Sequence, residues 1–571
     1  MTEIIYRDVP LGILEDSTIE FNNKQSFVNV NELKDEVIEA EKYGTLEQDF
    51  YLLDGTFKTF PDSPSNMEYM SEEMSDEEGN FQIPITMTRT FTNRYSATGM
   101  TIKFDTNTGD YCSKFNIAWY RDNELIDTAD FYPTDSEYIL NRLVEAFNKV
   151  VLTFYKTNKP YRYLKIHYLI DGMVRVFNKK ELLNLELLEE VSKTGETLPI
   201  NTFTFDLIVD KSVAYLFQNK QPIKLYHNDN FMGSFFIESA VQKSLKEFSV
   251  STTDYIGILD AENTYGGLYT ALQITDVLSD ILGTIPYELD ESFADKTVTG
   301  YLPISTKRVA LQQLAFSIGA IIDTSRSETI LILPYPKLAS ATFDKSKVFR
   351  GIQTEIEAIA TSVKLTEHNY YIKNETETLY EEILNGTITI ELSTPHRAYE
   401  ITNGTIVTSH PNYITITGTG NTVTLTGKTY TDKTRVLKKE NPHTTASTLK
   451  KEVEFADCSL ICSNNSEEVI DRLADICFNN KAVTGKVILG DERVGKIATI
   501  STDYGTKKAV LLSLVTDLNY KGKYAEAKFM EVEWCKIIWY MTVPFKILKT
   551  ELQKDIIILM TWTELSFGAY T

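Results

Sequence analysis

The sequence is short of cysteine, basic residues and long apolar runs, and each shortage excludes a class of protein. Its 571 residues include five scattered cysteines, so a disulfide framework is not expected. Asp and Glu outnumber Lys and Arg by 80 to 57, and a net charge of −23 disfavours nucleic acid as a partner. The apolar run near the end, Ile556 to Met560, is too short to span a bilayer. With no signal-peptide pattern at the start, we expect a cytosolic chain with reduced thiols and no membrane span.

Motifs for catalysis and cofactor binding are also missing. The sequence contains no GxSxG, HExxH, Walker or EF-hand motif. Its histidines are dispersed, and none stands near a Cys or Ser in a known nucleophile arrangement: His167, His227, His368, His396, His410 and His443. Only separation in space identifies a glycosidase carboxylate pair, so the many acids do not exclude one. We therefore expect no cofactor, no catalytic residue and no enzymatic activity.

Alternating strand-type residues dominate what is present. The pattern predicts a mainly β, multidomain fold with a β-sandwich, a small β-barrel and α+β domains. We expect seven segments: an acidic leader or linker (1–82), a sandwich (83–170), a barrel (171–265), an α+β helix-hairpin domain (266–365), a Thr-rich all-β insert (366–450), a closing α+β/β domain (451–534) and a C-terminal docking arm (535–571).

Two groups in the expected sandwich are candidate binding sites, one for calcium and one for a sugar. The stretch "FDTNTGDY" places the oxygens of Asp105, Asn107 and Asp110 on one turn, which suggests calcium, although any tight turn uses the same residue types. Trp119 and the tyrosines Tyr120 and Tyr161 would form a sugar-stacking platform if they face outward, and part of the core if they face inward.

The stretch "KRVALQQLAFSIGAIIDTSRSETILIL", from Lys307 to Leu333, changes period halfway. Its first half predicts a helix that Thr306 caps and Gly319 ends, and its second half predicts a β-hairpin. The helix and hairpin either complete a domain core or offer an apolar surface to other copies of the chain. For the second case the candidate assembly residues are Leu311, Leu314, Ile318 and Ile321.

Three stretches together resemble the baseplate hub proteins of phage tails and of phage-derived contractile injection particles. They are "QPIKLYHNDNFMGSFFIESAVQKSLKEFSVSTTDYIGILD", the helix-hairpin stretch above, and "VGKIATISTDYGTKKAVLLSLVTDLNYKGKYAEAKFMEVEW". In that family a short barrel leads through a helix-hairpin unit to a closing strand set. The leader "KYGTLEQDFYLLDGTF" resembles tail proteins of phages of Gram-positive hosts, and the 83–168 block resembles a discoidin-like (galactose-binding-like) sandwich. The sandwich and the 366–450 insert depart from the hub pattern.

The resemblance implies a structural virion protein of the tail baseplate, assembled in a bacterial cytoplasm. It implies a ring or trimer of this chain that contacts tail tube, spike and other baseplate proteins, and no functional residues to transfer. Two alternatives stay open: a host-surface adhesin that binds cell-wall glycan through the sandwich, and a cell-wall hydrolase. The sequence of a single chain does not predict the ring symmetry, the position in the baseplate or the host.

Overall fold

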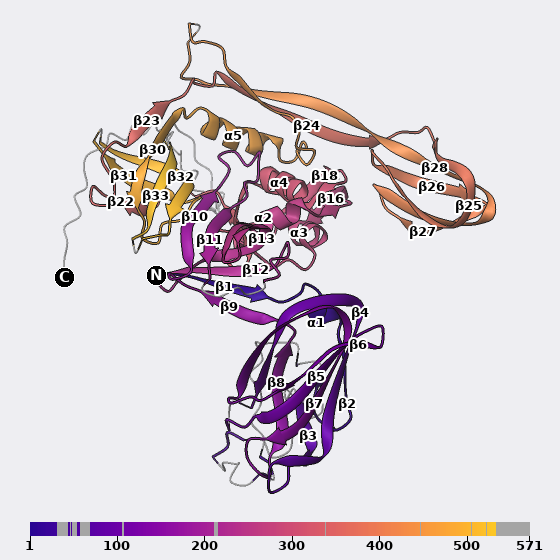
Figure 1. Cartoon of the computed structure of the whole chain (residues 1–571). Coiled ribbons are helices and arrows are strands. Elements are labelled where there is room, and N and C mark those ends of the chain that lie inside the picture. Colours follow the sequence, from indigo (N-terminus) through magenta and orange to yellow (C-terminus); the bar gives the residue numbers. More distant parts are fainter. Residues whose placement is uncertain are drawn as a thin grey trace, which may run out of the picture. The chain divides into compact units, whose positions relative to one another are not determined.

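The computed structural model describes residues 1–30, 33, 44–45, 47, 54–57, 69–105, 108–209, 215–336, 339–445, 447–503, 505–520 and 522–532. They form a mainly β, multidomain structure in which several sheets enclose separate hydrophobic cores, as the sequence predicts (Figure 1). The described helices are all too short or too polar to cross a membrane. The expected docking arm, 535–571, lies outside the described residues, as does most of the stretch 42–57.

The largest sheet has 13 strands and joins parts of the chain that are far apart in sequence. Its main path is β23 (Gln353–Ile356), β30 (Lys481–Ile488), β33 (Tyr524–Glu531), β32 (Gly505–Asp517), β10 (Leu182–Glu190), β11 (Thr202–Ile208), β14 (Glu247–Thr253), β13 (Asn230–Ser244), β12 (Pro222–His227), β1 (Thr2–Asp8) and β9 (Met173–Phe177). From β32 it branches to β31 (Ile497–Thr502) and β22 (Ala339–Phe343). The expected barrel and closing domain therefore share one sheet.

The first residues differ from the acidic leader expected over 1–82. β1 pairs with β12 on one side and β9 on the other, and Ile4 and Tyr6 are fully buried. The reason is local: "TEIIYRD" alternates with period two, which suits a half-buried strand. Further along, α1 (Ile13–Asp16), β2 (Thr18–Phe21) and β3 (Tyr69–Met74) follow, and both strands join the next sheet.

A seven-stranded sheet contains the expected sandwich region. Its path is β3, β8 (Tyr163–Ile170), β4 (Asn80–Phe104), β7 (Glu137–Thr157), β5 (Cys112–Arg121) and β6 (Glu124–Phe131), with β2 on β4. β4 has 25 residues and pairs with β2 in its first half and with β8 near its end, so this one strand joins both groups of strands. A large core of aromatic and aliphatic side chains packs against this sheet, and we call the sheet and its core the seven-stranded module.

The helix-hairpin stretch folds as the sequence predicts. α4 spans Lys307–Ile318, the Thr306 Oγ1 accepts from the Val309 N–H at 3.3 Å, and Gly319 ends the helix at φ 76°. β20 (Ala320–Asp323) and β21 (Ile330–Pro334) form the hairpin. Neighbouring elements complete this domain: α2 (Tyr255–Asp260), α3 (Ile274–Leu282), a 3₁₀ turn (Glu291–Phe293), β15 (Asn263–Thr264), β16 (Gly267–Gln273), β17 (Tyr287–Leu289), β18 (Thr297–Leu302) and β19 (Ser305–Thr306).

The Thr-rich insert is a six-stranded sheet built on one long strand. β28 (Tyr413–Glu440) pairs along its length with β24 (Ser362–Ile372), β25 (Glu377–Glu391), β26 (His396–Thr402) and β27 (Gly404–Ser409), while β29 (Glu452–Phe455) pairs with β24. The insert has a small core of its own. α5 (Ser466–Cys477) packs on β24. Its first residue, Ser466, donates to Glu367 Oε2 at 2.8 Å.

Candidate functional site

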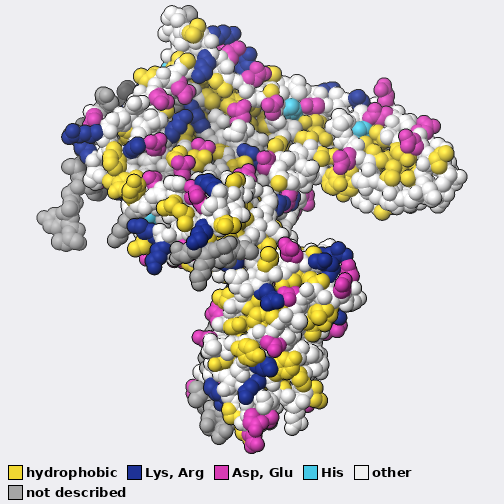
Figure 2. All heavy atoms as spheres, in the orientation of Figure 1, with side chains coloured by type: hydrophobic (Ala, Val, Ile, Leu, Met, Phe, Trp, Pro, Cys, Tyr) yellow, Lys and Arg dark blue, Asp and Glu magenta, His cyan; other side chains and the backbone are white. Residues whose placement is uncertain are grey.

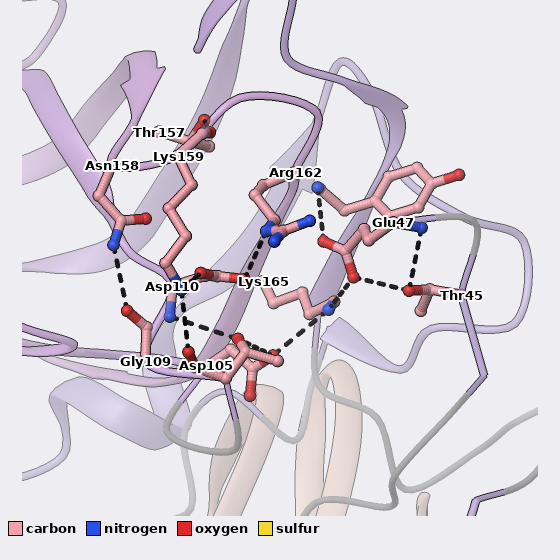
Figure 3. A network of polar contacts seen from close by, with 12 residues as sticks. Thr45, Glu47, Asp105, Gly109, Asp110, Thr157, Asn158, Lys159, Arg162 and Lys165 are labelled. Atoms are coloured by element: carbon pink, nitrogen blue, oxygen red, sulfur yellow. Dashed lines mark hydrogen bonds and ion pairs between the residues drawn. The ribbon is translucent and has the colours of Figure 1, made fainter. Parts of the chain in front are cut away.

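The turn that suggested calcium is filled by cations. Asp105 and Asp110 face each other in an antiparallel bridge at the end of β4 (Figure 3). Lys159 Nζ lies 2.6 Å from Asp110 Oδ1, and Lys165 Nζ lies 3.3 Å from Asp105 Oδ2. Asn107 lies outside the described residues. Because lysines already neutralise both carboxylates, this arrangement does not favour a divalent cation, and no group of three or more acidic, His or Cys side chains suited to a metal occurs among the described residues.

The same network holds Glu47 against the module. Its Oε2 lies 2.5 Å from Lys165 Nζ, and its Oε1 accepts from the Tyr163 backbone N–H at 2.8 Å. Glu47 and Lys165 are both almost completely buried. Figure 3 shows these polar side chains converging on one another, which is the geometry of a structural tether between separate segments of the chain.

The three aromatic residues proposed for glycan stacking do not share a surface. Trp119 is 3% exposed and packs edge-on against Phe131 in the core of the module. Tyr120 follows it in β5 and lies under the Lys149 ammonium at 5.4 Å from the ring centroid. Tyr161 is exposed in the turn after β7. Period-two alternation turns Trp119 inward, so this platform is not formed.

The residues expected to form an assembly surface are also buried. Leu311 and Leu314 are each 1% exposed and Ile318 is 8% exposed, all in the core that α4 forms with α2, α3 and α5. Ile321 is 8% exposed in the neighbouring core. An amphipathic pattern predicts that one face of a helix is covered, but it does not show whether the same chain or another copy covers it. Here other elements of the same chain cover the apolar face of α4.

Buried polar contacts fix the hairpin turn in place. Asp254 caps α2 with Oδ1 and accepts from the Thr324 hydroxyl with Oδ2 at 2.5 Å. Asn201 Nδ2 donates to the same hydroxyl at 2.8 Å. Arg326 forms two contacts of 3.3 Å with the Glu189 carboxylate, and both side chains are at least 96% buried. The turn thus completes the core of this chain rather than presenting a free edge.

Four exposed aliphatic side chains lie on or beside the outer face of the 13-stranded sheet. Leu183, Ile208, Val241 and Leu245 are 47, 40, 59 and 74% exposed. Asp206 and Ser249 lie between two of them: Leu183 is opposite Asp206, Asp206 is opposite Ser249, and Ser249 is opposite Val241. Ile208 is two residues from Asp206 on the same face, and Leu245 lies in the β13–β14 hairpin. We call these four residues the outer-face patch.

A cleft that the sequence did not predict lies between β16, β18, β24 and the insert. Its volume is about 980 Å³. Three of the histidines that are dispersed in the sequence line it: His368, His396 and His410. Burial lowers the pKa of His410. The only sequence signal for the cleft was the frequency of His and Tyr between residues 368 and 430. These residues come together because β28 pairs antiparallel with β24.

No protein-family model matches the chain, and neither does any curated protein sequence. Solved structures similar to it include a prophage tail protein of Listeria monocytogenes (11% identity, 63% of this chain and 91% of that chain, TM-score 0.38) and a tail protein of Neisseria meningitidis (13%, 63% and 94%, 0.38). A 43 kDa tail protein of a Shewanella oneidensis prophage is similar at 6% identity, with 62% and 95% covered and a TM-score of 0.40. TM-scores this low do not establish a shared fold, so function is argued from this chain's own residues.

Proposed function

We propose that this chain is a structural component of a phage or phage-derived tail baseplate, hub or hub-associated, which works by binding other proteins. The observation that carries the proposal is the outer-face patch. Soluble chains rarely leave several large aliphatic side chains together on a flat sheet face, and such patches mark protein contacts. Burying a Leu, Val or Ile side chain contributes roughly 1.5–3 kcal/mol, so four of them supply a useful part of the free energy of association.

The occupant we propose is a second copy of the chain. The patch is crossed by the Lys243–Asp206 ion pair, in which Lys243 Nζ lies 3.0 Å from Asp206 Oδ1. Lys243 Nζ also lies 3.8 Å from Glu247 Oε1, so one lysine serves two carboxylates within the patch. A basic side chain of a second copy can pair with the second carboxylate at the contact. On the face drawn in Figure 2 acidic and basic side chains are interspersed, so the net charge of −23 forms no single acidic field there to drive copies apart.

The finer parts of the proposal follow the sequence resemblance. They are contacts with tail tube, spike and other baseplate proteins, a virion location, a Gram-positive host and a galactose-binding-like origin of the seven-stranded module. The adhesin alternative required Trp119 on the surface to stack on a sugar, and Trp119 is buried in the core. The hydrolase alternative has no described cluster of side chains in its favour.

The test is the oligomeric state of the full chain, measured by analytical ultracentrifugation over rising concentration. We expect rings or trimers, and we expect Leu245→Asp to shift the chain toward monomer because it places a charge in the contact. Ile383→Asp is the matched control, since Ile383 is 72% exposed on the insert and outside the patch. A chain that stays monomeric at high concentration, or assembly unchanged by Leu245→Asp, would contradict the proposal.

A further inference from the structure

Few charged side chains line the cleft beside the insert, and those next to it are paired. Its 21 lining residues include no Asp, Glu or Lys, one Arg, Arg397, and three histidines. Two of the histidines are held by carboxylates: His368 Nδ1 lies 2.6 Å from Asp432 Oδ2, and His396 Nε2 lies 2.5 Å from Glu377 Oε1. A phosphate or carboxylate ligand would require several cations, and a cationic ligand would require acids. The lining therefore selects for an uncharged ligand, and its volume of about 980 Å³ is large enough for several linked rings.

The cleft combines aromatic rings with small hydrogen-bonding groups. Tyr371, Tyr399 and Tyr430 line it. Tyr371 is 55% exposed, and the Lys433 ammonium lies over one face of its ring, 5.1 Å from the centroid, so the opposite face is the one that a ligand can use. Asn369 and Thr299 are among the polar residues between them. Sugar rings present apolar C–H faces that stack on aromatic rings and hydroxyl edges that exchange hydrogen bonds with such polar groups. Tyr supplies both kinds of contact from one side chain.

One hydroxyl in the lining has no partner in the described part of the chain. Tyr269 is 93% buried, it lines the cleft, and its phenolic oxygen makes no hydrogen bond. Burial raises the pKa of this phenol, so it stays protonated and able to donate. A buried hydroxyl without a partner is unfavourable, and its oxygen has almost no accessible surface. A ligand therefore completes the hydrogen bond only if the Tyr269 ring turns toward the cleft.

Contacts between the insert and the helical domain hold the cleft open in a fixed shape. Asn412, in the turn between β27 and β28, is fully buried and its Nδ2 donates to Leu302 O at 2.8 Å. Tyr413 packs on Tyr265 with ring centroids 4.3 Å apart. On another side Tyr370, which lines the cleft, packs edge-on against Tyr301. Walls tied in this way pay little ordering entropy when a ligand binds.

We propose that this cleft binds a neutral oligosaccharide chain, with Tyr371 stacking on a sugar ring and the Tyr269 hydroxyl donating to a sugar oxygen. A peptide fits less well, because the cleft offers scattered hydroxyl and amide groups and aromatic faces rather than a row of apolar pockets. The inference is independent of the proposed assembly role, since the cleft and the outer-face patch share no residue.

The experiment is titration of the full-length chain with neutral tetrasaccharides of glucose, galactose, rhamnose and N-acetylglucosamine, read by saturation-transfer NMR and calorimetry. We expect at least one to bind. Tyr269→Phe removes only the partnerless hydroxyl; a purely structural Tyr269 would lose nothing, whereas a ligand donor loses affinity by about tenfold. Tyr371→Ala should weaken binding by about tenfold or more, and Tyr132→Ala, at an equally exposed tyrosine of the seven-stranded module, should leave it unchanged.

Four results would overturn the inference: no binding of any neutral tetrasaccharide at millimolar concentration, binding unaffected by both cleft variants, equal binding of the anionic hyaluronan tetrasaccharide, or displacement of the sugar by a proline-rich peptide that binds more tightly. Sedimentation of the cleft variants should match that of the unmodified chain. This separates failure of the sugar site from failure of the assembly proposal.

Discussion

The helix-hairpin unit, residues 305–334, and the Thr-rich insert, residues 362–440, have equally strong local patterns and opposite relations to the rest of the chain. The unit is buried on nearly every side, down to its turn residues Thr324 and Arg326. The insert buries only a small core and exposes residues such as Ile383 and Val407. Apolar periodicity is present in both, so it identifies an element without saying what covers it. What distinguishes the unit is the set of buried, paired polar groups in its turn.

The largest expected difference between the two regions comes from removing an arginine. Arg326→Ala leaves Glu189, whose pKa burial raises, without its partner in the core, and we expect a loss of about 3–5 kcal/mol in the free energy of unfolding. Arg435→Ala in the insert removes an arginine that is 61% exposed and pairs with Glu367. Glu367 is buried but keeps hydrogen bonds from Asn369 and Ser466, so we expect a much smaller loss. Chemical denaturation measures the change in the free energy of unfolding for both variants. Hydrogen exchange at residues 307–334 shows whether the loss in Arg326→Ala is local to the unit.

Equal effects of the two arginine substitutions would contradict the comparison. A second substitution separates a general charge effect from loss of the pair: Arg326→Met fills similar volume without charge, and with Glu189→Gln it should recover most of the lost stability. If the double variant is no more stable than Arg326→Ala, the pair is not what holds the turn.

The next effect is a loss of apolar packing. Leu314→Ala opens a cavity in the core that α4 forms, and we expect about 2–5 kcal/mol of destabilisation. Ile383→Ala, at a residue 72% exposed on β25, should stay within about 0.5 kcal/mol. Thermal unfolding followed by calorimetry gives both values. A large loss at Ile383 together with a small one at Leu314 would mean that the insert, and not the helical domain, carries the core.

The sequence predicted local elements well and their surroundings poorly. Thr306, Gly319 and the alternation around them sufficed to place α4 and the hairpin, because capping and period are properties of neighbours in sequence. For Trp119 and Leu311 the sequence left both a surface and a core position open, and both residues are buried, because burial depends on elements contributed from elsewhere in the chain. β1 was missed for the same reason, since its partners β9 and β12 come about 170 and 220 residues later. The cleft depends on the return of β28 past β24 and had only a compositional signal.

The remaining expected effect is a pH dependence of opposite sign in the two regions. Burial raises the pKa of Asp254 from 3.8 to about 6, so its folded state holds a proton more tightly than its unfolded state. Its contribution to stability is therefore full below pH 3.8 and is lost as the pH rises through 6, a change on the order of 3 kcal/mol. Glu452, at the base of the insert, has its pKa lowered to about 2 by hydrogen bonds from Lys438 and Lys364. It stabilises the chain above pH 4.5 and loses that contribution as the pH falls toward 2.

Hydrogen exchange measured between pH 3.5 and 6.5, corrected for the intrinsic exchange rate, separates the two trends. Peptides containing Thr324 should gain protection relative to global unfolding as the pH falls from 6 to 4, and peptides of β29 should lose it. Asp254→Asn keeps an amide oxygen for the Ile256 and Gly257 N–H groups but does not titrate, so it should abolish the first trend and leave the second. If the turn instead loosens in acid in the unmodified chain, Asp254 is not the group that sets its stability, and the contrast between a turn fixed by buried polar groups and an insert fixed by exposed ion pairs is wrong.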